Sequence, residues 1–240
     1  MQLTHDAEAL AAALPDMPRW LETRSLLLSG NASVRVSDDG HGGVVLDTTF
    51  PSGAVFGRAD CEFLREVLVE VPEDFELVVQ MDTLQAAQEA LPSWTVAQAV
   101  VHSLVRPYPS GERAEAGVVV SAPPEQRWLE GLPEDVRLYA RLAEAIAVQI
   151  VGGAVVAVCA AGDVTETLWD VGIDTLEGHR RRGHAAACFH ALAAWMAGRG
   201  RQPVWSAYED YPPSLTLAAK LGFQPVDRIA VLSPTSQATS

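Results

Sequence analysis

The sequence predicts an α/β protein with a mixed sheet, and three observations support this fold class. Short stretches with the period of a strand alternate with stretches of helical period along most of the chain. Gly152 and Gly153 join two apolar stretches, which is a strong signal for a hairpin of two strands. Residues 168–175 alternate apolar and polar side chains and then pass through a loop into an amphipathic helix, forming a βα unit.

The chain has 240 residues, which is enough for one large domain or two small ones. Residues 106–111, Arg-Pro-Tyr-Pro-Ser-Gly, form the best linker in the sequence because Pro and Gly interrupt both helices and strands. We therefore expect two domains, an acidic N-terminal α/β domain at 1–105 and a second domain at 106–240.

In the first half, residues 5–14 predict a short helix that Pro15 and Pro18 end. Apolar runs between turns rich in Ser, Asn, Asp and Gly predict strands. Phe63 and Val67 have helical spacing and predict a helix. In order, we expect strands at 24–28, 33–36 and 44–50, a helix at 59–69, a strand at 76–81, a helix at 83–91 with Asp82 or Thr83 as N-cap, and a strand at 95–105.

The second half shows the same kinds of pattern. Gly222 follows a helical segment directly and fits a left-handed C-cap. We expect a strand at 118–121, helices at 123–130 and 134–143, the hairpin at 146–151 and 154–160, a strand at 163–175, a helix up to 197, a strand at 204–208, a helix at 214–221 and a strand at 225–232.

The loop between the strand at 163–175 and the next helix has the composition of an anion site. Arg180, Arg181 and Arg182 are consecutive, and Gly183 follows them. The first N–H groups of a helix lack intrahelical partners, and the helix dipole adds partial positive charge at this end. Glycine lets a phosphate approach the backbone closely. The alternative is an ordinary βα unit with a solvated arginine cluster.

Two segments of the second half match a known pattern in the right order. Residues 180–185 fit Arg/Gln-x-x-Gly-x-Gly/Ala, and residues 205–223 predict a strand and a helix that ends at Leu-Gly-Phe. On these segments, within about the last 75 residues, the chain resembles the GNAT acyltransferases, in the branch with an extra N-terminal half. The order of elements from residue 117 is also that of the GNAT fold. Residues 91–94, Leu-Pro-Ser-Trp, resemble the leader of this branch.

The resemblance implies acetyl-CoA as co-substrate. Backbone N–H groups of Arg181, Arg182, Gly183, His184 and Ala185 would bind its pyrophosphate, with charge from the Arg180 and Arg182 side chains. The backbones of Ile173 and Thr175 would pair with the pantetheine arm like an added strand. Ser214 matches a serine that is frequent in relatives. The chain departs from the family at two places, with Thr175 where Val is common and Glu177 where Pro is common.

The family's usual general base is missing. It would stand at Trp169 or Val171, and neither residue can titrate. Asp170, one residue away on the other face of the strand, is a candidate for catalysis or for a structural role. The other acids near the expected site are Glu166, Glu209 and Asp210, and a water relay is a further alternative.

The usual proton donor, a tyrosine four residues before the glycine of Leu-Gly-Phe, is also missing. Ala218 occupies its position. Tyr208 and Tyr211 flank the same strand–helix loop and are the substitutes we consider for the acid, with substrate-lining or packed tyrosines as the alternative.

The N-terminal half lacks a basic glycine loop, so we expect no cofactor in it. It ends with a strand–helix–strand run like that of the second half. A degenerate GNAT-like copy is therefore a hypothesis for this half.

Composition excludes several classes of partner. The net charge is −14, which disfavours nucleic acid backbones and anionic lipid, and no apolar run is long enough to span a membrane. The first ten residues do not have the pattern of a signal peptide, and three cysteines without paired spacing fit the cytoplasm. The histidines lack metal-ligand spacing, so we expect no metal. We leave a homodimer open.

Together these observations favour an acyl-CoA-dependent N-acyltransferase, an enzyme that transfers acetyl from acetyl-CoA to a primary amine by direct attack. The acceptor stays open among antibiotics, polyamines, amino acids and protein amines. The alternatives are a non-catalytic acyl-CoA-binding or interaction protein of GNAT fold and an α/β module without cofactor.

Overall fold

A computed structural model describes residues 7–111 and 115–235. The first two residues of the helix expected at 5–14 lie outside this range. The chain divides into two compact units, and unit 1 draws on both ends of the sequence. Unit 1 consists of Met1–Val101, Ala207–Thr216 and Pro225–Ser240, and unit 2 of His102–Ser206 and Leu217–Gln224.

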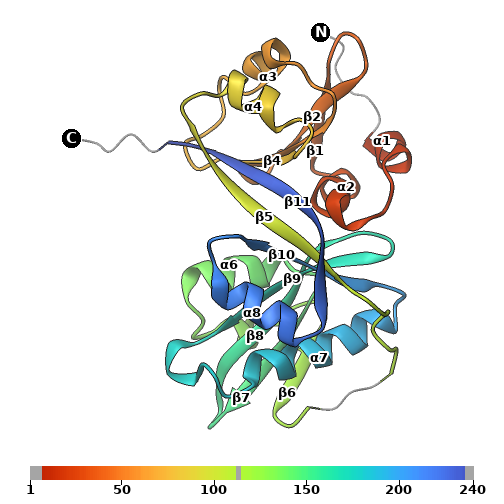
Figure 1. Cartoon of the computed structure of the whole chain (residues 1–240). Coiled ribbons are helices and arrows are strands. Elements are labelled where there is room, and N and C mark those ends of the chain that lie inside the picture. The colour runs from red at the N-terminus through yellow and green to blue at the C-terminus, as the bar shows by residue number, and fades with distance from the viewer. Residues whose placement is uncertain (1–6, 112–114, 236–240) are drawn as a thin grey trace, which may run out of the picture. The chain divides into compact units, whose positions relative to one another are not determined.

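Unit 1 contains a mixed sheet with helices on both of its faces (Figure 1). Its elements are α1 Ala7–Ala13, η1 Pro18–Trp20, α2 Leu21–Leu28, β1 Ala32–Val36, β2 Gly42–Asp47, β3 Ser52–Gly57, α3 Cys61–Val67, β4 Glu76–Gln80, α4 Leu84–Ala90, most of β5 Trp94–Leu104 and most of β11 Phe223–Pro234.

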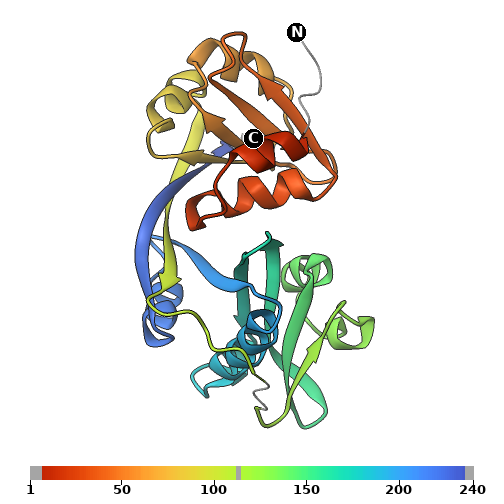
Figure 2. The ribbon, with the colours of Figure 1, turned by 90° about the vertical axis from the view of Figure 1, so that its right-hand side faces the viewer.

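Adjacent residues of a strand point to opposite faces, and this explains the two cores of unit 1. Val44 and Leu77 are buried in a cluster with residues of α3 and α4, whereas Val45 and Phe56 are buried in a second cluster with residues of α1 and α2. Figure 2 shows α1 and α2 together on one side of the sheet.

Unit 2 has the same layered plan. Its elements are β6 Val118–Ser121, α5 Gln126–Leu129, α6 Glu134–Leu142, β7 Ala145–Val151, β8 Ala154–Val164, β9 Leu168–Thr175, η2 Glu177–His179, α7 His184–Ala197, most of β10 Gln202–Tyr208 and part of α8 Pro212–Lys220. Residues of α5 and α6 pack with buried residues of β7 and β8. Helix α7 is apolar around most of its surface, and Phe189 stacks on the buried Trp169 of β9 at 6.5 Å.

The strand order is β1-β2-β3-β4-β11-β5-β10-β9-β8-β7-β6 in a sheet of 11 strands. Strand β4 is parallel to β3, and β10 is parallel to β9, while the pairs β1–β2, β2–β3, β7–β8, β8–β9 and β4–β11 are antiparallel. The sheet is thus mixed, as the sequence predicts.

The order of elements occurs twice along the chain. Two helices, three antiparallel strands, a helix, a parallel strand, a helix and a last strand run from α1 to β5 and again from α5 to β11. This repetition supports the hypothesis that the N-terminal half is a degenerate copy of the fold of the second half.

Three elements differ from the sequence-based expectation. The expected strand at 24–28 is part of helix α2, because leucine is also a good helix former and Leu21 and Leu27 are buried on one side of it. Strand β3 is absent from the sequence-based expectation, because Pro51 and two glycines interrupt the pattern of its short apolar run. The expected strand at 163–175 is interrupted, because β8 continues to Val164 and the chain turns there. The Leu168 N–H donates to Thr165 Oγ1 at 3.0 Å in this turn.

We expect the fragment 106–240 to be insoluble or misfolded on its own. Strand β11 pairs with β4, with Ile229 opposite Gln80 and Leu232 opposite Leu77, and its Ala230 and Leu232 are buried in unit 1. Removing 1–105 exposes this apolar strand edge, which promotes aggregation. Size-exclusion chromatography and near-UV circular dichroism beside the full chain test this. A monomeric fragment that folds cooperatively and binds acetyl-CoA would instead support independent domains, so the boundary at 105 stays a prediction.

Candidate functional site

Strands β9 and β10 are paired over a short stretch only. Their register joins Leu168 with Gln202, Trp169 with Pro203 and Asp170 with Val204. The remainder of β9 lies beyond this register and remains antiparallel to β8 on its other side, up to the pair of Thr175 with Ala157. Ile173 and Thr175 therefore lie on the part of β9 that follows its pairing with β10.

The end of β9 is closed by local hydrogen bonds. The Thr175 N–H donates to Asp174 Oδ1, and the Thr175 carbonyl accepts from Arg180 Nε at 3.0 Å. Side chains thus form the hydrogen bonds of the Thr175 N–H and carbonyl that a neighbouring strand would otherwise form. An extended ligand that adds to β9 here has to replace these two bonds, and Arg180 links the strand to the loop that follows.

The loop between β9 and α7 has backbone geometry suited to an anion. Gly183 is the N-cap of α7 with φ +85°, and a Cβ placed on it would meet no other atom within 4 Å. Arg181 also has a positive φ of 61°, which is uncommon for a residue other than glycine and recurs at functional loops. Because the cap has no side chain, it leaves the first N–H groups of this 14-residue helix open to a ligand.

The side chains around this helix N-terminus add positive charge. Arg180, Arg181 and Arg182 are exposed, as is Gly183, whereas His184 and Ala185 are partly buried. A diphosphate has negative oxygens that suit both arginine side chains and helix N–H groups. The cofactor residues expected from the sequence therefore lie on one strand–loop–helix segment of unit 2, and their role stays a prediction.

Asp170 is the unusual titratable group of this segment. One oxygen, Oδ1, is buried and has no hydrogen-bond partner. Burial, and after it the negative charge of Asp163, raise the pKa of this carboxyl to about 7. Hydrogen bonds from the backbone N–H groups of Val171 and Ser206 oppose this increase. The Ser206 bond places the carboxyl at the point where β10 leaves β9.

A carboxyl with a pKa near 7 exchanges protons readily at physiological pH, which is a property of general acids and bases. The sequence shows that Asp170 follows the usual base position by one residue. It carries no signal for the Ser206 amide or for the burial of Oδ1, because both depend on how β9 and β10 separate.

Tyr208, Tyr211 and Ser214 belong to unit 1. Tyr208 is 39% exposed, and its pKa is raised by partial burial and then by the charges of Glu76, Glu22 and Asp210. Tyr211 is 55% exposed. Its N–H donates to the Tyr208 carbonyl at 3.1 Å, and the Ser214 N–H donates to the Tyr211 carbonyl at 3.2 Å. The three residues are thus held in one turn that leads from β10 into α8.

Glu209, one of the alternative acids, has a partner. Its carboxylate forms an ion pair with Arg228 Nε at 2.8 Å, and its N–H donates to the Gln98 carbonyl at 2.9 Å. This ion pair engages the carboxylate with Arg228, although an exposed pair contributes little to folding. Asp170 is therefore the better candidate for a group that accepts and releases a proton.

The corresponding loop of unit 1, between β3 and α3, ends in a helix N-terminus that carries a carboxylate. Asp60 is the N-cap of α3, and its side chain accepts a hydrogen bond from the Phe63 N–H at 2.9 Å. A carboxylate thus occupies the helix end where α7 has an open glycine, and it would repel a phosphate. This difference supports the expectation that the N-terminal half binds no cofactor, which stays a prediction.

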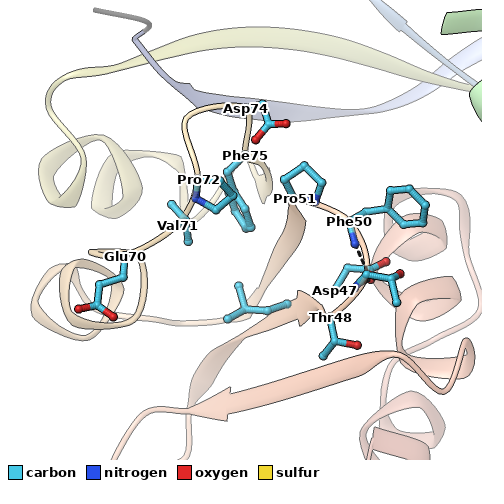
Figure 3. A pocket seen from close by; sticks show the side chains of 11 residues that line it. Asp47, Thr48, Phe50, Pro51, Glu70, Val71, Pro72, Asp74 and Phe75 are labelled. Atoms are coloured by element: carbon cyan, nitrogen blue, oxygen red, sulfur yellow. Dashed lines mark hydrogen bonds between the residues drawn. The ribbon is translucent and has the colours of Figure 1, made fainter. Parts of the chain in front are cut away.

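A hollow of about 450 Å³ in unit 1 lies at the other end of the strands (Figure 3). Phe50 and Pro51 line it just before β3, and Pro72 and Phe75 just before β4. Asp47, which also lines it, accepts hydrogen bonds from its own turn, including the Phe50 N–H at 3.1 Å. Ligands of parallel βα units bind at the carboxyl ends of the strands, so we do not place the active site here.

Two further observations concern metal and membrane. Over residues 7–111 and 115–235, no group of three or more His, Cys, Asp or Glu side chains is arranged to hold a metal ion. The helices within these ranges include none long and apolar enough to cross a membrane.

Solved structures share this fold, and the segment around the arginine loop matches a known protein family. Residues 140–232, which include β9, the arginine loop and α7, match the model of the GNAT acetyltransferase family. A GCN5-related N-acetyltransferase-like protein from Streptococcus suis 89/1591 superimposes with a TM-score of 0.66 at 16% identity, covering 95% of this chain and 98% of that one. A putative GNAT-family acetyltransferase from Novosphingobium aromaticivorans has a TM-score of 0.64 at 18% identity, covering 92% and 98%. No curated protein matches the sequence.

A third similar structure is a tandem GNAT protein from the clavulanic acid biosynthesis pathway, with a TM-score of 0.52 at 15% identity and coverage of 99% and 98%. The protein is therefore an α/β protein of GNAT fold with an extra N-terminal half. Residues 140–232 are similar to the GNAT acetyltransferase family, and this match together with the shared fold supports a general acyl-transfer function.

Proposed function

We propose that the protein is an N-acetyltransferase that transfers acetyl from acetyl-CoA to a primary amine by direct attack. The observation that carries this proposal is the open N-terminus of α7, with Gly183 as a left-handed N-cap beside three arginines, within the segment that matches the family. The acceptor, a small molecule or a protein amine, is not part of the proposal.

In this proposal the pyrophosphate of acetyl-CoA binds the backbone N–H groups of residues 181–185, and Arg180 and Arg182 contribute charge. The pantetheine arm lies along β9 at Ile173 and Thr175 and exchanges hydrogen bonds with their backbones. Ser214, on α8, contributes to binding of the same cofactor. These assignments combine the resemblance with the geometry of the β9–α7 segment.

The chemistry requires a base and an acid. The amine nitrogen attacks the thioester carbonyl carbon, a proton leaves the nitrogen for Asp170, and the carbon–sulfur bond breaks. The sulfur then takes a proton from a phenol. Asp170 suits the first role because its pKa of about 7 lets it accept a proton at neutral pH.

Tyr208 and Tyr211 are the candidates for the second role. Tyr208 follows Ser206, whose N–H binds Asp170, by two residues of the same strand. Two residues of a strand span about 7 Å, and their side chains point to the same face. The short spacing along the strand between Ser206 and Tyr208 supports Tyr208 as the donor. Tyr211, in the turn that follows, is the alternative.

A non-catalytic acyl-CoA-binding protein is the second candidate function. Trp169 and Val171 occupy the usual base positions, and Ala218 occupies that of the usual donor. Calorimetric titration with acetyl-CoA, followed by thiol release with a panel of amines, distinguishes the two. Binding without thiol release for any amine favours the second candidate, and no binding contradicts both.

We expect the double variant Tyr208→Phe, Tyr211→Phe to lower turnover by roughly 10²-fold or more, the usual contribution of a positioned acid. Acetyl-CoA affinity should change little, because the phosphates are held by another segment. Steady-state kinetics and calorimetry measure the two effects. Tyr108→Phe is the matched control, since the Tyr108 hydroxyl bonds His190 Nδ1 at 2.9 Å outside the proposed machinery. Unchanged turnover in the double variant would remove both tyrosines from the mechanism.

We also propose a cytoplasmic location, which the free cysteines Cys61, Cys159 and Cys188 support, since such thiols persist in reducing compartments.

A further inference from the structure

One face of β9 carries a row of polar positions opposite helix α6. Alternation along the strand puts Asp170, Gly172 and Asp174 on the same face. Gly172 is opposite Ala160 and Asp174 is opposite Val158 on β8. Ala160 and Val158 pack in the cluster that α6 covers, so this row faces α6.

Tyr139 of α6 lies directly against this row. A Cβ placed on Gly172 would be 3.2 Å from Tyr139 Cε2 and 3.4 Å from Cδ2. Both distances are tight, so glycine at this position allows the ring to approach the strand closely. The ring is therefore fixed on β9 two residues from Asp170.

The Tyr139 hydroxyl is buried and has no hydrogen-bond partner. Its pKa is raised, first by burial and then by the charge of Asp174, so the phenol stays neutral and keeps its proton. A buried polar group without a partner costs folding free energy, and such groups are rare in native proteins. A phenylalanine would fill the same space without this cost.

Asp170 Oδ1 is a second buried atom without a partner on the same face. An unpartnered acceptor on β9 and an unpartnered neutral hydroxyl of α6 thus lie on the same face of the strand, the first at Asp170 and the second on the ring that packs at Gly172. Two such groups, each costly when left alone, are explained together if one ligand binds both.

Building on the proposed acetyltransferase function, we infer that Tyr139 positions the acceptor by a hydrogen bond to a second polar group of it. The acceptor class is a primary amine whose nitrogen reacts beside Asp170 and which carries a second polar group, a hydroxyl, amide or amine, at the end of a short chain that reaches the Tyr139 hydroxyl. Tyr139 acts here as a specificity-determining residue for the same reaction.

The test compares two probes of equal chain length, 4-aminobutan-1-ol and butylamine, in wild type and in Tyr139→Phe. We expect wild type to prefer the amino alcohol by about tenfold in kcat/KM, through KM, which is the usual contribution of one hydrogen bond. In Tyr139→Phe this ratio falls to about one. Acetyl-CoA affinity is unchanged, and Tm is equal or higher because the unpartnered hydroxyl is gone.

A structural role alone would change both probes equally and leave their ratio intact. An unchanged ratio in Tyr139→Phe, or no preference in wild type, overturns the inference while the acetyltransferase proposal stands. If wild type turns over neither amine, that proposal fails for these acceptors. Calorimetric binding of the same two probes to the protein saturated with CoA then gives the ratio without chemistry. Absence of binding, or equal binding of both probes, overturns the inference.

Discussion

Replacing Gly183 by Glu is expected to weaken acetyl-CoA binding by 100-fold or more. Gly183 is the N-cap of α7, and the space where its Cβ would be is open. In the proposed complex that space holds the pyrophosphate. A glutamate there adds bulk and a negative charge beside the phosphates, and a close pair of like charges costs several kcal/mol, equivalent to a factor of 100 or more.

The control is Gly200→Glu. Gly200 follows the other end of α7, has φ +80° and also has no atom within 4 Å of a placed Cβ. Both variants therefore carry the strain of a left-handed residue and the same added charge. Calorimetry should show weak binding only in Gly183→Glu. Equal affinity in the two variants would show that the cofactor does not bind at this helix end.

Much of the fold is visible in the sequence because local signals are strong there. Gly152 and Gly153 predict the hairpin of β7 and β8, and the apolar period of 184–197 predicts α7, both as observed. Helix α2 was missed because leucine-rich runs suit both helix and strand. The participation of β11 in unit 1 depends on long-range pairing, for which a single sequence carries no signal.

The candidate site is only partly visible in the sequence for the same reason. The arginine–glycine loop is local, so its residues could be named in advance. The pKa of Asp170 depends on the burial of its carboxyl and on the Ser206 N–H of another strand. Tyr139 gave no sequence signal, because its significance lies in its contact with Gly172 and in its unpartnered hydroxyl.

Burial of Asp170 has a cost for stability that can be measured. Its pKa of about 7 in the folded protein lies above the value of about 3.9 in an unfolded chain. The folded state therefore binds the proton more tightly. The stability that this group contributes is fully present below about pH 4 and is lost as the pH rises through about 7. The three-unit difference corresponds to a loss on the order of 4 kcal/mol at pH 8.

We expect Asp170→Asn to be more stable than wild type at pH 8 and much less active. Asparagine cannot ionise, yet its side-chain oxygen can still accept from the Val171 and Ser206 N–H groups. The gain in unfolding free energy should be small near pH 4 and increase towards pH 8. Loss of a general base should lower kcat by roughly 10² to 10⁴-fold. Chemical denaturation at several pH values and steady-state kinetics measure these effects.

Asp163→Asn is the matched control, because the charge of Asp163 raises the Asp170 pKa. This variant keeps the base, so the increase of turnover with pH near 7 should move to lower pH. In Asp170→Asn that increase should be absent. Higher stability together with lost activity is expected for a catalytic group whose burial lowers the stability of the folded protein. If Asp170→Asn is destabilised at pH 8 and retains full turnover, the carboxylate has a structural role and the base must be sought elsewhere.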